Sequence, residues 1–233
     1  MKITYDIGII GAMSEEVESI ISMLSEPSCE EHLGISFHCG AIGGKRVVIA
    51  KCGVGKVFAA ACAAAMIINY SPKLLVNTGV GGGLNPAISV CDIVVADRLC
   101  QHDMDTSAIG DPRGMVSGVN LIWFESDKRA CDIILDSARA LGFPARRGSV
   151  ASGDKFIASA KDKADIASAF GADVCEMEGA AIAQVAYISK TPFAVIRAIS
   201  DTATDGSGMD YMEFLPIAAG RSAALTLALI EKY

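Results

Sequence analysis

The sequence lacks a long apolar run, a basic cluster and any cysteine pair with metal-ligand spacing. The longest apolar run, residues 57–68, falls well short of the roughly 20 residues that a membrane-spanning helix needs. The N-terminus carries a lysine and an early aspartate without an extended apolar segment, so we expect no signal peptide and no membrane partner. Lysines and arginines are scattered through a chain of net charge −7, which argues against nucleic acid as a partner.

The eight cysteines follow no metal-binding or redox pattern. No pair has the CxxC spacing of zinc or thioredoxin-like sites, and several lie in apolar stretches, as buried reduced thiols do. His102, Asp103 and Asp105 could suggest a metal site, but these ligands come from one short cluster, which argues against it. We therefore expect a cytoplasmic protein with no metal and no other cofactor.

The apolar residues that are present indicate a globular α/β protein. They make up 52% of 233 residues, which excludes a disordered chain. No linker, repeat or charge block divides the sequence, so we expect a single domain over residues 1–233. Apolar strands that do not alternate, separated by helices, predict a three-layer sandwich in which helices flank a central twisted sheet. Some strands follow one another without a helix, so the sheet should be mixed.

Hydrophobic periodicity and turn residues place the elements along the chain. Strands are predicted at residues 6–11, 35–39, 46–51, 74–78, 92–97, 147–151, 173–176 and 193–198, and helices at 14–24, 56–69, 127–141, 161–170, 179–188 and 211–231. Ser14 is the predicted N-cap of the first helix, and the glycines of residues 79–83 should close the preceding strand. Ligands in such sheets bind outside the carboxyl ends of strands, which directs attention to four segments: residues 11–16, 77–83, 152–157 and 198–201.

Two glycine-rich loops follow strands, at residues 53–56 and 79–83. Neither is a Walker A loop, because Val57 stands where Ser or Thr would coordinate magnesium, and the glycine spacing does not match GxGxxG. Each loop is as compatible with a tight turn as with close approach of the backbone to a ligand.

Three carboxylates, Glu16, Glu178 and Asp201, stand at or beside strand ends. Each alone could be a charge in the first turn of a helix or in a loop. Together on one sheet, two of them could supply the acid and the base of a hydrolysis, provided that their surroundings separate their pKa values.

Five motifs in the sequence resemble those of a known family. IGIIGAMSEEV, NTGVGGG, SGDKFI, CEMEGAAIAQV and VIRAISDTA occur in this order, and residues 7–231 resemble the methylthioadenosine/S-adenosylhomocysteine nucleosidases of the purine nucleoside phosphorylase-like superfamily. EMEGAA with RAISD is specific to that superfamily, and GAMSEEV points to its nucleosidase branch. The resemblance implies a nucleoside phosphorylase-like fold and hydrolysis of the N-glycosidic bond of 5′-thio-substituted adenosines. That activity releases adenine and a thioribose product, in methionine salvage and nucleoside catabolism.

The resemblance also implies residue roles. Asp201 matches the general acid that protonates adenine N7, and Glu16 matches the carboxylate that activates water. Arg197 is interpreted as a partner of Glu178 or Glu16. The matching substrate-binding positions are Met13, Val80, Phe156, Ile157, Glu176, Met177, Glu178 and Ser200. Among these, Phe156 would stack on adenine, the Ile157 backbone would bind its edge, and Glu178 would bind the ribose hydroxyls beside Met177. Without the family, Phe156 and Met177 would be interpreted as core residues.

The same resemblance predicts an apolar pocket for the 5′-alkylthio group, with Ile109, Tyr211 and Phe214 as candidates. Relatives are homodimers in which the neighbouring subunit helps to line this pocket. We therefore expect a homodimer in which Ile109 comes from the partner subunit.

Three alternatives stay open at this point. A phosphorylase would use phosphate in place of water, but Glu16 would repel phosphate and the first loop carries no arginine. Val80 replaces a serine found in many relatives, nucleosidases included. A hydrolase could also prefer another adenine nucleoside, such as aminodeoxyfutalosine. The third alternative is a non-catalytic nucleoside-binding module.

Overall fold

The structure, a computed structural model, describes residues 4–202 and 208–233, with residues 208–211 described by their backbone alone. Its strands are β1 Ile7–Gly11, β2 Ser25–His32, β3 Ile35–Ile42, β4 Lys45–Lys51, β5 Leu74–Gly83, β6 Ile93–Gln101, β7 Phe124–Glu125, β8 Ala145–Ser152, β9 Val174–Glu176 and β10 Phe193–Asp201. Its helices are α1 Ser14–Ile21, α2 Lys56–Tyr70, α3 Lys128–Ala140, α4 Ala160–Phe170, α5 Gly179–Ser189 and α6 Gly208–Lys232, with a 3-10 helix, η1, at Ser107–Ile109.

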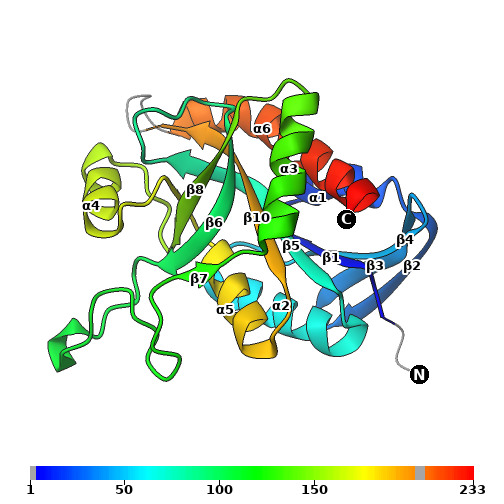
Figure 1. Ribbon diagram of the computed structural model, residues 1–233, viewed down its shortest axis with the longest axis horizontal. Helices are drawn as coiled ribbons and strands as arrows, with labels where there is room; N and C mark the ends of the chain where they lie inside the picture. The colour runs from blue at the N-terminus through cyan, green and yellow to red at the C-terminus, as the bar shows by residue number, and fades with distance from the viewer. Residues whose placement is uncertain (1–3, 203–207) are drawn as a thin grey trace.

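The strands of the described residues form one mixed sheet of ten strands, in the order β10-β6-β8-β9-β5-β1-β4-β3-β2, with β7 beside β6. A second pairing of β10, with β5, closes part of this sheet into a ring. The ring contains β5, β10, β6, β8 and β9. The strands β1, β4, β3 and β2 extend from β5 in that order to the edge of the sheet (Figure 1). The predicted mixed α/β sheet is therefore confirmed.

Helices cover both faces of the sheet, as predicted (Figure 1). On one face α2 and α5 pack against each other, and on the other face α6 packs against α1 and α3. Strand β1 shows why its sequence does not alternate: Ile9 faces the core beneath α1, α3 and α6, and Ile10 faces the core beneath α2 and α5. Both faces of this strand are dry, so both need apolar residues.

Helix α6 contains the segment Met212–Lys232, which is long enough and apolar enough, by length and composition, to cross a membrane. In this structure half of the most apolar 18-residue stretch of this segment is buried. The helix packs against β10 and β5, with α1 and α3 beside it, and it supplies Ala218, Leu225 and Leu229 to the core. It therefore occupies the place of a core helix.

Two local predictions are wrong. Residues 79–83 do not close a strand but continue β5, because Gly79 and Gly82 pair with β10 and Gly82 also pairs with β9. A β-carbon at Gly79 would lie 2.6 Å from the Glu16 Oε1 atom, so glycine makes room for a side chain of the neighbouring helix. The N-cap of α1 is Met13 and not Ser14, which is the first helical residue.

Strand β2 is missing from the prediction. Its sequence, SEPSCEEH, is polar and mostly exposed at the edge of the sheet, so it has no hydrophobic pattern to detect. It is held by antiparallel pairing to β3.

Candidate active site

A cavity of about 330 Å³ opens where β1, β5, β9 and β10 end. Its lining brings together ten of the residues that the sequence predicted, namely Met13, Glu16, Val80, Phe156, Ile157, Glu176, Met177, Glu178, Ser200 and Asp201. Six further lining residues were not named individually, Ala12, Val54, Gly81, Gly82, Lys155 and Cys175, although all except Cys175 lie in segments or loops that the sequence singled out. Four of these are small or apolar without functional groups, so only their place beside predicted residues could have signalled them.

Glu16 is anchored by backbone amides at the start of α1. Its Oε2 atom accepts hydrogen bonds from Ala12 N at 2.6 Å and Met13 N at 3.0 Å, and its Oε1 atom accepts one from Val80 N at 3.1 Å. Burial raises the pKa of Glu16, while the positive charge of Arg197 and the three amides oppose that shift. A carboxylate with a raised pKa is a stronger proton acceptor than an exposed one, which suits a general base.

Glu178 is the N-cap residue of α5 and binds the glycine-rich loop before α2. Its Oε1 atom accepts a hydrogen bond from Gly55 N at 2.8 Å, and Gly55 has a φ of 103° that favours glycine. Burial and the negative charge of Glu176 raise the pKa of Glu178 to about 7, against the opposing charge of Arg197. The loop therefore has a role beyond turning the chain: it holds a carboxylate at the pocket wall.

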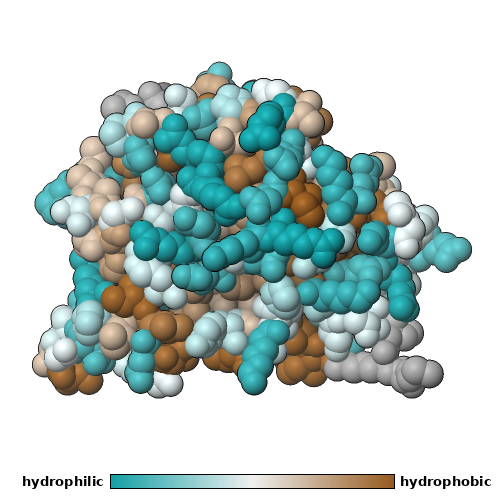
Figure 2. Space-filling model, in the orientation of Figure 1, coloured by the Kyte–Doolittle hydropathy of each residue, from teal (hydrophilic) through white to brown (hydrophobic). Residues whose placement is uncertain are grey.

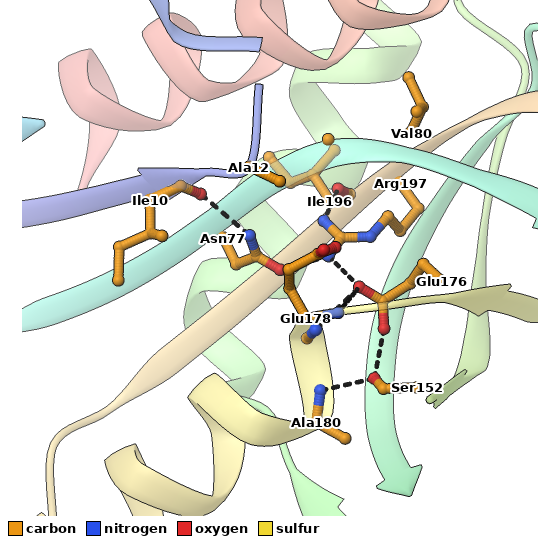
Figure 3. Close-up of polar contacts among 12 residues, drawn as sticks. Ile10, Ala12, Asn77, Val80, Ser152, Glu176, Glu178, Ala180, Ile196 and Arg197 are labelled. Atoms are coloured by element: carbon orange, nitrogen blue, oxygen red, sulfur yellow. Dashed lines mark hydrogen bonds and ion pairs between the residues drawn. The ribbon is translucent and has the colours of Figure 1, made fainter. Parts of the chain in front are cut away.

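Arg197 pairs with Glu176, which corrects the expectation that its partner is Glu178 or Glu16 (Figure 3). The guanidinium is 1% exposed and also donates to Asn77 and to the Ile196 carbonyl. Burial alone would lower the pKa of Arg197, but the charge of Glu176 and their hydrogen bond raise it above its ordinary value. Asn77, a polar residue that follows the apolar start of strand β5, was the available signal for this network.

Glu176 has both oxygens occupied by protein donors (Figure 3). Its Oε2 atom accepts from Glu178 N at 3.0 Å and Gly179 N at 2.8 Å as well as from Arg197, and its Oε1 atom accepts from Ser152. Burial would raise the pKa of Glu176, but the Arg197 charge and these donors lower it. Glu176 lines the pocket, yet its described contacts hold the start of α5 and not a ligand.

Asp201 ends β10 with both carboxylate oxygens in hydrogen bonds. The Oδ1 atom accepts from Ser200 Oγ at 2.8 Å, and the Oδ2 atom accepts from Lys163 Nζ at 2.5 Å. Lys163 lies on α4, is 2% exposed, and was not identified from the sequence. Lysine is so often a surface residue that its presence in a helix gives no signal of burial.

Two predicted residues, Ile109 and Phe214, do not line the cavity of their own chain. Ile109 is 82% exposed on η1, away from the pocket of its own chain. Phe214 is half-buried on α6 but does not line the cavity, and the side chain of Tyr211 lies outside the described residues. Phe156 lies at the cavity and is 49% exposed.

The fold agrees with comparisons to known proteins. Residues 6–231 match the family model of the phosphorylase superfamily, and the chain belongs to that family. It is 38% identical, over 97% of this chain and 99% of the relative, to the 5′-methylthioadenosine/S-adenosylhomocysteine nucleosidase of Haemophilus influenzae. It is 36% identical, over 97% of this chain and 98% of the relative, to the aminodeoxyfutalosine nucleosidase of Campylobacter jejuni.

A solved structure shows the same fold. The 5′-methylthioadenosine/S-adenosylhomocysteine nucleosidase of Neisseria meningitidis, in complex with methylthio-immucillin-A, matches with a TM-score of 0.94 at 33% identity. The match covers 98% of this chain and 100% of that one.

Proposed function

We propose that this protein hydrolyses the N-glycosidic bond of 5′-methylthioadenosine and S-adenosylhomocysteine. The observation that carries the proposal is a single cavity that holds Glu16, with its raised pKa, together with Asp201 at the end of β10. The H. influenzae and N. meningitidis relatives, which are named for these two substrates, support it. In the cell, such an activity belongs to methionine salvage and nucleoside catabolism.

The proposed mechanism divides acid and base work between the two carboxyl groups. Asp201 gives a proton to adenine N7, which draws the electrons of the breaking C1′–N9 bond into the base. Glu16 takes a proton from the water that attacks C1′. The negative charge of Glu178, at the ribose hydroxyls, stabilises the positive charge that develops on the sugar. Phe156 stacks on adenine.

The charges around the cavity favour water over phosphate as the nucleophile. Among the described lining residues, Lys155 is the single cation, and its ammonium is 2.6 Å from Asp162 on α4. A phosphate ion would meet the carboxyl groups of Glu16, Glu178 and Asp201 without the clustered donors that hold phosphate.

Adenine release from methylthioadenosine in phosphate-free buffer tests this function. We expect turnover without phosphate and no stimulation when phosphate is added. The Asp201→Asn protein is the matched control, and its rate should fall by about 10²- to 10⁴-fold because the acid is lost. Phosphate-dependent release would show a phosphorylase, and tight binding of the nucleoside without turnover would show a binding module.

A second substrate is aminodeoxyfutalosine, favoured by the C. jejuni relative. Rates on methylthioadenosine, adenosylhomocysteine and aminodeoxyfutalosine, measured on one preparation, rank the three. A kcat/KM for aminodeoxyfutalosine well above the other two would replace the main substrate assignment and leave the hydrolytic mechanism in place.

We further propose that the active form is a homodimer. Large apolar side chains are exposed on adjacent helices, with Val57, Phe58 and Ile68 on α2 and Tyr187 and Ile188 on α5. Hydrophobic residues gather along the lower edge of the molecule, where α2 and α5 lie (Figure 2). A second copy on this face would bring its own Ile109 toward the 5′ end of the pocket.

We also propose a cytoplasmic location and a single domain over residues 1–233. All eight cysteines are free in the structure, which fits a reducing compartment. One continuous sheet spans the elements from β1 to β10, which supports the single domain.

A further inference from the structure

Ser222 places a hydroxyl group in the apolar interface between α6 and β5. It is fully buried on a helix that supplies Ala218 and Ala223 to the core of this face. A buried hydroxyl group is costly unless it is hydrogen-bonded, so alanine would satisfy the packing at this position. The Ser222 Oγ atom instead accepts a hydrogen bond from Gly79 N at 3.1 Å and lies 2.6 Å from the Thr78 Oγ1 atom. The hydroxyl group thereby joins the helix to the backbone of the strand.

Strand β5 has β10 as its one strand partner over residues 78–81, among the strands that the structure describes. Its pairing with β1 ends at Asn77, and its pairing with β9 begins at Gly82. In this stretch Val80 N donates a hydrogen bond to the Glu16 Oε1 atom at 3.1 Å. Side chains from α1 and α6 therefore bind the backbone of β5 where a second strand does not, and one of them is the proposed base.

Gly79 is the residue of this stretch with the most backbone freedom. A β-carbon there would lie 2.6 Å from the Glu16 Oε1 atom, so the close approach of the carboxylate requires glycine. Glycine has a wider range of backbone angles than any other residue. Val80 N follows one residue later, so a rotation at Gly79 would turn that amide away from Glu16. The hydrogen bond from Gly79 N to Ser222 opposes this rotation.

We propose that Ser222 is a positioning residue for Glu16: by accepting a hydrogen bond from Gly79 N, it keeps the Val80 amide directed at the Glu16 carboxylate. The inference rests on the proposed function, because it takes Glu16 as the base that activates water. Ser222 does not line the cavity, so its effect passes through the backbone of β5. Without the hydroxyl group, Glu16 keeps the amides of Ala12 and Met13 and loses part of its hold on the third.

The proton affinity of Glu16 reports on the Val80 amide. Burial raises the pKa of Glu16, and the charge of Arg197 on β10 and the three amides oppose that shift. The other titratable groups that face Glu16, among the described residues, are Glu178 at the start of α5 and Cys52 after β4. A hydrogen bond to a carboxylate favours its charged form, so a weaker bond from Val80 N should raise the pKa of Glu16 further.

The variant Ser222→Ala removes the hydroxyl group and keeps a residue that suits a helix. For adenine release from methylthioadenosine we expect kcat to fall by about tenfold, because a small displacement of a catalytic group is costly. KM should stay unchanged, since Glu16 acts on water and not on the nucleoside. The acid limb of the kcat–pH profile should move by about one unit to higher pH, because the base must lose its proton to act and now holds it more tightly.

Thr226→Val is the matched control. Thr226 is fully buried on the same helix, and its hydroxyl group donates to the Ser222 carbonyl oxygen at 2.9 Å without reaching β5. Valine keeps the shape of the side chain and removes the hydroxyl group. We expect a lower Tm, as for Ser222→Ala, together with the kcat and the pH profile of the wild type.

Amide hydrogen exchange followed by NMR gives a readout that does not depend on turnover. The Gly79 and Val80 amides should exchange about tenfold faster or more in Ser222→Ala than in Thr226→Val. Equal exchange in the two variants would overturn the proposal. So would an unchanged acid limb in Ser222→Ala, or an equal loss of kcat in Thr226→Val, which would show a general effect of helix packing. If the wild type releases no adenine, the proposed function fails, and the exchange rates still decide whether Ser222 holds the strand.

Discussion

The acidic residues of the pocket differ in what their neighbours do to their protons. Glu176 accepts from Arg197 and from two backbone amides, and its pKa is lowered. Glu178 binds one backbone amide and lies beside the charge of Glu176, and its pKa is raised to about 7. The two carboxyl groups of the EMEG motif thus have different roles: Glu176 holds the backbone of α5, and Glu178 can gain or lose a proton at the cavity.

Glu178→Gln is expected to stabilise the ligand-free protein at alkaline pH. The pKa of Glu178 is about 7 in the fold against an ordinary 4.5, so between these values the folded state binds more protons than the unfolded state. This contribution to stability is fully present below pH 4.5 and is lost as the pH rises through 7. The difference corresponds to on the order of 3 kcal/mol.

Thermal unfolding at pH 5.5 and pH 8 measures this effect. The variant should show a smaller fall in Tm between the two pH values than the wild type, and nucleoside binding should weaken. Glu18→Gln is the control, since Glu18 is an exposed carboxylate on α1. Parallel pH dependence in the wild type and Glu178→Gln would contradict the assignment.

The sequence predicted the carboxylates that line the cavity better than it predicted the charged pairs around them. Glu16, Glu178 and Asp201 were found because they stand in motifs at strand ends, and the sheet brings those ends together at one cavity. The Glu176–Arg197 pair and Lys163 were not found. Each of these partners comes from an element distant in sequence, and burial of a charge is visible only once the elements pack.

The elements themselves were predicted where hydrophobic pattern dominates. The two-sided strand β1 and the Ala-rich helix α2 follow from apolar runs. The glycine run of β5 misled the prediction, because glycine usually ends a strand, whereas here it makes room for side chains from α1 and β10. Tertiary contact, and not local preference, determines that stretch.

Gly79→Ala tests that explanation. The added β-carbon would lie 2.6 Å from Oε1 and 3.1 Å from Cδ of Glu16, so the carboxylate must move away from the Val80 amide. We expect kcat for adenine release to fall by about tenfold or more, since small displacements of a catalytic group carry large costs.

Gly220→Ala on α6 is the matched control for this substitution. Its β-carbon meets no atom within 4 Å, and alanine is favoured in a helix, so activity should be retained and stability should rise slightly. A Gly79→Ala enzyme with normal kcat would show that Glu16 tolerates displacement and would contradict its role as the positioned base.

At the scale of the whole molecule, the apolar excess of the sequence has several destinations. Two cores lie on opposite faces of the sheet, and a third small core lies under α4. Part of the remainder lies on the exposed surface of α2 and α5, where Val57 is 79% exposed. Surfaces of this kind mark sites of association.

Val57→Glu is expected to break the proposed homodimer. Wild-type protein should elute at twice the chain mass of 24.2 kDa, and the variant should elute as a monomer with weakened turnover of methylthioadenosine. Leu33→Glu is the control, because Leu33 is equally exposed at the turn between β2 and β3, outside this face. A wild-type monomer with full activity in size-exclusion and kinetic measurements would contradict the proposal.

The closed ring of strands bears on how the enzyme loses activity on ageing or heating. Asp201 is in register with Gly82, and Arg197 with Gly79, across the β5–β10 pairing that closes the ring. The proposed acid, Asp201, therefore lies on one of these two strands, and the proposed base, Glu16 on α1, accepts a hydrogen bond from Val80 N of the other strand. The distance between these groups should therefore be kept as long as the sheet stays folded. On ageing or heating, each molecule should lose its activity completely when it unfolds, and folded molecules with reduced activity should not accumulate.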